Sequence, residues 1–355
     1  MPSAAIQKYD FETGVFRPPS EGGSFSLLVR FTRNCPWNRC EFCAMYKTEK
    51  FELRGLEEIK QDIDAMAAMC QDLRALSGQS GRGRNGGVSH EGAVALLGRH
   101  PELNYHQGFA MVYHWLISGG KTAFIQDANS LIMPPDQLIE ALRHLRRTFP
   151  SLSRVTSYGR SKTLAQRKPE ELLAIREAGL DRLHVGLETG DDELLRRMKK
   201  GVTAQGHIEG GRKAMAAGFQ LSEYWMPGLG GKQFSQAHAL HTAQTLNAIN
   251  PNYIRSRPFN PLPGTSLEAA VAEGRLQTLT PREQLLELQQ MIEALEVTSR
   301  VCFDHAANYW TDRRGDLLFT HDYEGYQFPA EKPKVLARIA EGLLNDIRHP
   351  TFLSL

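Results

Sequence analysis

The sequence has few cysteines, little net charge and no long apolar run. Five of its 355 residues are cysteine, and 42 Lys and Arg against 40 Asp and Glu leave a net charge of +2. So small an excess gives no reason to expect a nucleic-acid or membrane-surface partner. No stretch approaches the length of a membrane span, and the opening residues lack the apolar core of a signal peptide. We therefore expect a cytoplasmic protein, in which clustered cysteines favour metal binding over disulfides.

The chain does show a regular alternation of strand-like and helix-like segments. Hydrophobic residues make up 41% of the sequence and charged residues 23%, which is ordinary for a globular protein with a sizeable core. Short apolar, β-rich segments occur at residues 24–32, 121–128, 154–158, 180–188, 218–226 and 251–257. Helical patterns separate them, so the order predicts an α/β fold with a parallel sheet. A partial barrel of about six strands and an open doubly wound sheet both fit, and in either fold ligands gather at the carboxyl ends of the strands.

Two regions break this alternation. A Gly-rich loop followed by a helical insert occupies about residues 78–119. After about residue 280, the pattern predicts a helix near 281–299, a polar stretch, and a terminal helix near 331–347. We therefore expect an N-terminal arm (1–20), a main domain (21–280) and a helical C-terminal extension (281–355) that covers the carboxyl ends of the strands.

Three of the five cysteines lie in one short loop after the first apolar segment. The stretch "RFTRNCPWNRCEFCAMY", residues 30–46, places Cys35, Cys40 and Cys43 in a Cys-x4-Cys-x2-Cys pattern among polar residues, where plain core packing fits poorly. Three thiolates can hold an iron–sulfur cluster or part of a zinc site. No second Cys-x2-Cys pair or nearby His supplies a fourth zinc ligand, and Cys70 and Cys302 lie in patterns typical of small buried residues. Three ligands on a four-iron cluster leave one iron open to a substrate.

This pattern, with Phe42 before the last cysteine, resembles the radical S-adenosylmethionine (SAM) superfamily. The usual pattern of that superfamily has three residues between the first two cysteines, and this chain has four, Pro36 to Arg39. The resemblance implies a partial (β/α)6 barrel with a C-terminal helical extension, a [4Fe–4S] cluster held by the three cysteines, and SAM on the open iron. It also implies reductive cleavage of SAM to a 5′-deoxyadenosyl radical that abstracts hydrogen from an organic substrate.

The resemblance extends over roughly residues 16–310. The segment "FRPPSEGGSFSLLVRFTRNCPWNRCEFCAMY" is similar to the opening of an iron–sulfur oxidoreductase group in the coproporphyrinogen oxidase and methylthiotransferase branch. In the same resemblance "FIQDANSL" falls after the second strand, "HVGLETGDDELLRRMKKGVT" matches the fourth-strand segment, and "MPGLGGK" matches the loop after the fifth strand. By this resemblance, Gln126 and Asp127 contact the methionyl amino group, Glu188 reaches the ribose, and Lys200 pairs with the SAM carboxylate. The full set of cofactor-binding residues that it implies is Phe42, Gln126, Asp127, Ser157, Glu188, Lys200, Tyr224 and Met226.

Each strand-end residue also has a purely structural interpretation. Glu188 precedes "TGDDELL", which opens a helix, and helix N-termini favour carboxylates. Lys199 and Lys200 lie in the last turn of that helix, where cations suit the dipole. Asp127, before Asn129 and Ser130, fits turn chemistry. The position of Glu188 at a strand's carboxyl end favours a ligand contact, and for Lys200 the two interpretations are even.

Several polar residues at later strand ends are candidates for substrate contact. Since Arg pairs with carboxylate and phosphate in a bidentate way, the basic members favour a substrate that carries such a group. Alternation along a strand places Arg255 and Arg257 on the same face. The candidate lining residues are Tyr158, Arg160, Arg255, Arg257, Asp304 and His305.

The resemblance implies two partners, a small or medium organic substrate and an electron donor such as flavodoxin or ferredoxin. The alternative is a binding or electron-transfer protein whose cysteines hold zinc or a cluster without SAM. The strand-end residues Gln126, Asp127, Glu188 and Lys200 favour the enzyme, because an electron carrier needs no contacts to a methionyl group or a ribose.

Overall fold

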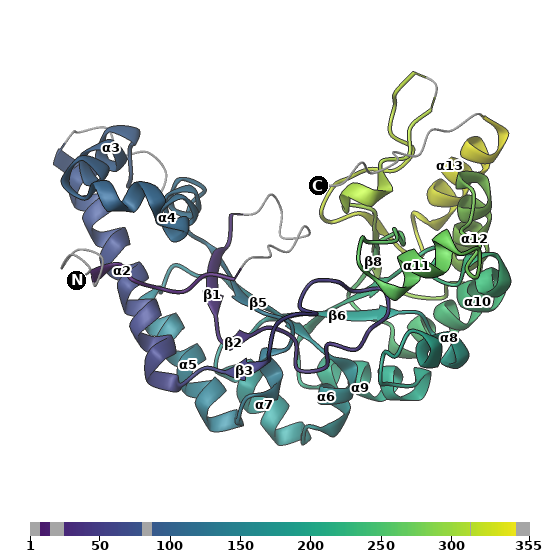
Figure 1. The fold of residues 1–355 in the computed structure, drawn as a ribbon, viewed down its shortest axis with the longest axis horizontal. Helices are drawn as coiled ribbons and strands as arrows, with labels where there is room; N and C mark the ends of the chain where they lie inside the picture. Colours follow the sequence, from purple (N-terminus) through teal and green to yellow (C-terminus); the bar gives the residue numbers. More distant parts are fainter. Residues whose placement is uncertain (1–7, 15–24, 80–86, 313, 346–355) are drawn as a thin grey trace. The chain divides into compact units, whose positions relative to one another are not determined.

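The computed structural model describes residues 8–14, 25–79, 87–312 and 314–345 of the chain (Figure 1). Its main sheet has the strand order β1-β4-β5-β6-β7-β8-β9-β10. The pairs β1–β4, β4–β5, β7–β8 and β8–β9 are parallel, whereas β10 runs antiparallel to β9. The bounds are β1 (Leu27–Arg30), β4 (Thr122–Gln126), β5 (Arg154–Gly159), β6 (Arg182–Glu188), β7 (Gln220–Trp225), β8 (Tyr253–Ser256), β9 (Arg300–Cys302) and β10 (Tyr326–Gln327). The six predicted strands and the parallel α/β sheet are thus confirmed.

Helices follow the strands because each carries an apolar stripe that the sheet or a neighbouring helix buries. In α5 (Pro135–Thr148), the buried side chains are Leu138, Ala141, Leu142 and Leu145, at the spacing of one helix face. The other helices between the strands are α6 (Ser161–Gln166), α7 (Pro169–Glu177), α8 (Asp192–Arg197), α9 (Ala204–Ala216), α10 (Gly231–Ile249) and α11 (Ser266–Ala272). No helix among the described residues is long and apolar enough to cross a membrane.

The chain divides into two compact units, each with its own internal contacts. The first comprises residues 1–36, 50–158 and 173–182. Its long helix α2 (Leu56–Gln79) packs against α5 and against the helices of the predicted insert, α3 (His90–Arg99) and α4 (Gln107–Ile117). The insert also contains the short helix η1 (Pro101–Tyr105), while most of the predicted Gly-rich loop, residues 80–86, lies outside the described residues.

A small two-stranded sheet in this first unit flanks the cysteine loop. Strands β2 (Thr32–Arg33) and β3 (Glu52–Leu53) pair antiparallel, with Thr32 opposite Leu53. The chain therefore leaves β2, forms the cysteine loop, and returns as β3, which pairs with β2.

The second unit comprises residues 37–49, 159–172 and 183–355. Here the C-terminal extension differs from the expected helical cover. Helices α12 (Pro281–Ala294) and α13 (Lys332–Leu344) are present, as the pattern predicts, but β9 and β10 between them extend the sheet beyond β8. These strands have three and two residues, which is too short for the alternation of side chains to show in the sequence.

Candidate functional site

The cysteine loop begins at Asn34, which the first unit holds in place. Asn34 has a backbone φ of 65°, in the left-handed region that few non-glycine residues adopt. Its backbone N–H donates to Oδ2 of Asp127 at 2.9 Å, and its side-chain Nδ2 donates to the carbonyl of Lys50 at 2.6 Å. Asn34 therefore ties the start of the loop both to its end and to the carboxyl end of β4. Cys35, half-buried, is the next residue.

The two residues expected at the methionyl amino group, Gln126 and Asp127, have partners within the first unit. The side chain of Gln126 forms two hydrogen bonds with the backbone of Gly14, accepting from its N–H at 2.9 Å and donating to its carbonyl at 3.2 Å. Asp127 accepts from Nε of Arg30 at 2.7 Å in addition to its bond with Asn34. Both residues are buried, at 1% and 3% exposure. Sequence reasoning missed Arg30 and the N-terminal arm as neighbours of these residues.

The rest of the loop, with Cys40 and Cys43, belongs to the second unit. The N–H of Cys43 donates to the carbonyl of Cys40 at 3.3 Å, so the two cysteines flank a tight turn. Burial raises the pKa of the Cys40 thiol, while the positive charges of Lys200 and Arg160 act in the opposite direction. These cations would favour the thiolate, which is the form that binds iron.

The donor set of the loop consists of thiols, which are the usual ligands of iron–sulfur clusters. All five cysteines carry thiol groups rather than disulfides, and those of the loop are half-buried whereas Cys70 and Cys302 are buried. Among the described residues, no three His, Cys, Asp or Glu side chains are grouped so that they could hold a metal ion. The fit to a [4Fe–4S] group therefore rests on the chemistry of three thiols in one loop.

Glu188 and Lys200, expected at the ribose and the carboxylate of SAM, form an ion pair in the second unit. Nζ of Lys200 lies 2.9 Å from Oε1 of Glu188, and the two side chains are 13% and 12% exposed. The same ammonium lies 5.7 Å from the ring centroid of Phe42, so three predicted cofactor residues come together here. A Cβ on Gly186 in β6 would lie 2.1 Å from Oε1 of Glu188 and 3.0 Å from Nζ of Lys200, so a larger residue there would displace this pair.

Trp37, in the same loop, was not predicted as a site residue. Its indole Nε1 donates to the carbonyl of Lys199 at 2.6 Å. Three cations surround its ring, with Arg39, Arg160 and Lys162 at 5.2, 4.9 and 5.7 Å from the centroid. A large aromatic between the first two cysteines was the only signal in the sequence. The predicted substrate residue Arg160 therefore lies beside the cysteine loop and not at a distance from it.

The remaining predicted cofactor residues are largely buried. Phe42 packs against an apolar cluster that contains Met226 and also Leu194, Met198, Leu229, Phe259 and Leu267. Tyr224 is 7% exposed and contacts the ring of His184 edge-on, with 5.4 Å between the centroids. Ser157 is fully buried in the first unit, where its hydroxyl lies 3.1 Å from the carbonyl of Tyr158.

Two buried titratable side chains near Lys200 were also missed. On β7, both carboxylate oxygens of Glu223 are buried and have no hydrogen-bond partner among the described residues. Burial raises the pKa of Glu223 well above its usual value, against the influence of Lys200. His207 on α9 lies 2.6 Å from the hydroxyl of Ser161, and burial together with Lys200 and Arg160 lowers its pKa to about 3. His207 is therefore neutral at neutral pH, and burial favours the protonated form of Glu223.

The last substrate candidates form a separate group at the end of β8. Arg255 is 1% exposed, and its Nη1 lies 2.8 Å from Oδ2 of Asp304, so a carboxylate already neutralises it. Arg257 follows the end of β8 and is half-buried. Burial and the charges of Arg257 and His321 lower the pKa of His305 to about 4. Of these side chains, Arg257 is the cation whose charge has no carboxylate within ion-pair distance among the described residues.

Comparison with known proteins gives one family match and several similar folds. A family model described as the Radical SAM superfamily matches residues 29–241, more than half of the chain. No curated protein matches the chain.

The similar solved structures share little sequence with this chain. Methylornithine synthase (PylB) is 16% identical, with 79% of this chain and 66% of that one covered and a TM-score of 0.43. Coproporphyrinogen III oxidase (HemN) from Escherichia coli is 16% identical, with 76% and 51% covered and a TM-score of 0.45. Elp3 from the archaeon Methanocaldococcus infernus is 12% identical, with 60% and 55% covered and a TM-score of 0.46. The matched region spans between half and two thirds of each of these proteins.

Proposed function

The chain belongs to the radical SAM superfamily, and from this premise we propose that Cys35, Cys40 and Cys43 hold its [4Fe–4S] cluster and that it abstracts hydrogen from an organic substrate. A [4Fe–4S] cluster held by these cysteines would supply one electron for the reductive cleavage of SAM to methionine and a 5′-deoxyadenosyl group, which would leave as 5′-deoxyadenosine after hydrogen abstraction from the substrate. The electron comes from a small one-electron carrier such as flavodoxin or ferredoxin.

The observation that carries this proposal is the ion pair between Glu188 and Lys200 beside Phe42 of the cysteine loop. An ammonium group has three donors, and Glu188 occupies one of them, so Lys200 retains donors for the carboxylate of SAM. Glu188 has a second oxygen with which to accept from a ribose hydroxyl. An electron-transfer protein without SAM needs no contacts to a SAM carboxylate or a ribose.

The contacts at the methionyl amino group stay a prediction for Gln126 and Asp127, together with roles for Ser157, Tyr224 and Met226 in the SAM site. Water exclusion supports these roles, since each of the five side chains is at least nine-tenths buried. Placement in the coproporphyrinogen oxidase and methylthiotransferase branch rests on the motifs alone.

The substrate is proposed to carry a carboxylate or a phosphate. Because Asp304 neutralises Arg255, this proposal now depends on Arg257 and Arg160, with Tyr158 and His305 as neighbours in the sequence. Arg257 raises the local positive potential enough to contribute to the lowered pKa of His305. An anionic group near Arg257 would restore the balance of charge there.

Anaerobic reconstitution tests the proposal. The protein loaded with iron and sulfide should show broad visible absorption and should release 5′-deoxyadenosine from SAM when a reductant is added. Cys40→Ala should abolish both signals, whereas Cys302→Ala is the matched control and should keep them. Zinc in place of iron, or a cluster that transfers electrons but never cleaves SAM, would contradict the proposal in favour of the electron-transfer alternative.

A further inference from the structure

The carboxylate of Asp127 accepts hydrogen bonds from other residues of the protein. Its side chain is 1% exposed, and the single oxygen Oδ2 accepts from Nε of Arg30 at 2.7 Å and from the backbone N–H of Asn34 at 2.9 Å. The other oxygen lies close to the N-terminal arm, because a Cβ on Gly14 would lie 2.9 Å from Oδ1. Hydrogen bonds to a charged acceptor are about twice as strong as neutral ones. This carboxylate is therefore firmly committed to the residue that precedes Cys35.

The backbone of Asn34 lies in the left-handed region, at a φ of 65°. Asparagine enters this region more readily than other non-glycine residues, and the groups that surround it hold it there. Besides its bond to Asp127, Asn34 accepts from Nη2 of Arg30 at 3.2 Å and donates to Lys50 at 2.6 Å. The direction in which the chain enters Cys35 is thus set by Asp127 and Arg30 together.

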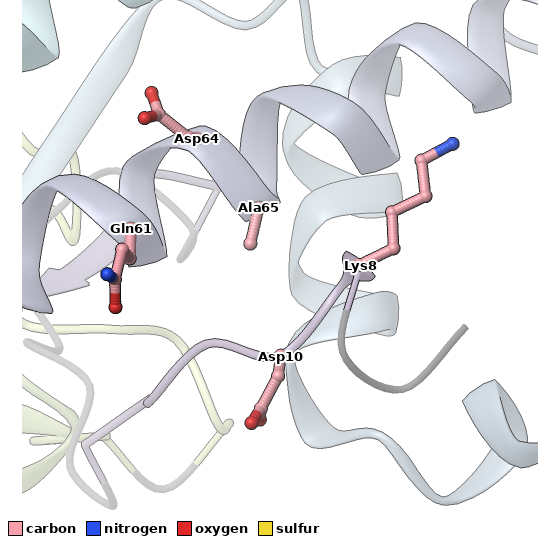
Figure 2. Close-up of a pocket in the computed structure, with 5 residues that line it drawn as sticks. All are labelled: Lys8, Asp10, Gln61, Asp64 and Ala65. Carbon is pink, nitrogen blue, oxygen red and sulfur yellow. The ribbon is translucent and has the colours of Figure 1, made fainter. Parts of the chain in front are cut away.

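The N-terminal arm in turn holds Arg30. Glu12 lies 2.5 Å from Nη1 of Arg30 and also pairs with Arg33. The N–H of Glu12 donates to Asp62 of α2 at 3.2 Å. Figure 2 shows the start of the arm, where Lys8 and Asp10 line a pocket with Gln61, Asp64 and Ala65 of α2.

We propose that Asp127 is a positioning residue for the cluster loop, which it fixes through Arg30 and Asn34, and that Glu12 of the N-terminal arm completes this support. The inference rests on the proposed function in one respect, that Cys35 is a cluster ligand. It gives Asp127 a role that differs from a contact to the methionyl amino group. The two roles predict different results when the carboxylate is removed.

The chain contains a matched carboxylate for comparison. Asp181, also in the first unit, pairs with Arg146 and accepts from the backbone N–H of Val155 at 2.7 Å. It thus bonds an arginine and a backbone N–H, as Asp127 does, and it also pairs with Arg176 at 3.2 Å. It directly precedes β6, bonds to the start of β5, and lies far along the chain from the cysteines. Asp181→Ala should cost stability without a specific effect on the cluster.

The experiment measures cluster retention in the full chain. Parent, Asp127→Ala, Asp127→Asn, Glu12→Gln and Asp181→Ala are reconstituted anaerobically, and circular dichroism of the apo proteins confirms folding. Iron per chain is determined, and the decay of visible absorption is followed after addition of an iron chelator. Removal of groups that orient metal ligands costs roughly 10- to 100-fold in metal affinity. We expect Asp127→Ala to lose its cluster at least tenfold faster than the parent, with smaller effects in the same direction for Asp127→Asn and Glu12→Gln.

Two results would overturn the inference. One is retention of the cluster by Asp127→Ala at the parent's rate, whether or not its affinity for SAM falls. The other is equally fast loss from Asp181→Ala, which would show that general destabilisation is the cause. Asp127→Asn, which preserves side-chain volume, decides the question if Asp127→Ala does not fold. A failure of the proposed function is distinguishable, because the parent itself would then take up no iron or Cys35→Ala would keep its cluster.

Discussion

Replacement of Glu188 by glycine should have two effects of opposite sign on the free energy of unfolding. Glu188 has a φ of 65°, so glycine at this position should recover about 1 kcal/mol of backbone strain. The same change removes the carboxylate that Lys200 contacts at 2.9 Å, and it leaves an ammonium that is 13% exposed without its partner. Breaking a buried pair in this way costs roughly 3–5 kcal/mol. We therefore expect Glu188→Gly to be less stable than the parent by about 2–4 kcal/mol.

Urea unfolding of the apo protein measures this difference, and a second substitution identifies its origin. In Glu188→Gly/Lys200→Met no charge is left unpaired, so stability should return to the parent value or exceed it by about 1 kcal/mol. A single Glu188→Gly variant that is as stable as the parent would refute the reasoning, and so would a double variant that recovers nothing. Titration of SAM into reconstituted Glu188→Ala should show a loss on the order of 1–3 kcal/mol in binding, because a hydrogen-bond partner is removed.

Three further predictions concern His207, Glu223 and Gly201, all in the second unit. His207 has a pKa of about 3 in the folded protein against about 6.5 in the unfolded chain, so the unfolded chain binds a proton first as the pH falls. The free energy of unfolding should therefore fall by about 1.4 kcal/mol per pH unit between pH 6.5 and pH 3. In His207→Gln, the urea midpoint should change less between pH 7 and pH 5 than it does in the parent. Burial raises the pKa of Glu223 in the folded protein, so the unfolded chain releases this proton first and stability falls as the pH rises above about 4.3. Glu223→Gln should therefore be more stable than the parent at pH 8 but not at pH 4. An equal gain at both pH values would contradict this. Gly201→Ala places a Cβ 2.3 Å from the ring of Trp37 at a φ of 75°. Gly274→Ala is the matched control, because its φ is 72° and its Cβ would meet nothing within 4 Å. The unfolding temperature should therefore fall clearly further for Gly201→Ala than for Gly274→Ala.

The sequence predicted the parts of the fold that repeat. Six strands could be located because each is four to seven residues of apolar, β-rich chain between helical patterns. Strands β9 and β10 are too short to leave such a pattern, and their pairing depends on the tertiary position of the chain after α12. The direction of the chain through the extension could therefore not be predicted from periodicity.

The sequence named individual candidate residues of the site but not the contacts between them. Glu188, Lys200 and Phe42 were each named, yet the pairing of the first two depends on how the chain returns after α8. Asp127 was named for its place at a strand end, but its partner Asn34 lies 93 positions away in the sequence. Such pairs have no local signal, because each member obeys only the rules of its own segment. The same holds for Glu223, because nothing in its strand sequence indicates that its carboxylate has no hydrogen-bond partner among the described residues.

The two short strands of the C-terminal extension have a practical consequence for anyone who shortens or divides this protein. Arg300, Val301 and Cys302 pair in parallel with Tyr253, Ile254 and Arg255, so β9 covers the outer side of β8. A chain cut after α12 would turn β8 into an edge strand with exposed backbone N–H and C=O groups, which is a template for aggregation. It would also remove Asp304 and leave the buried guanidinium of Arg255 without its carboxylate. Fragments intended to isolate the barrel should therefore end beyond β10, even though the alternation of strands and helices in the sequence stops after about residue 280.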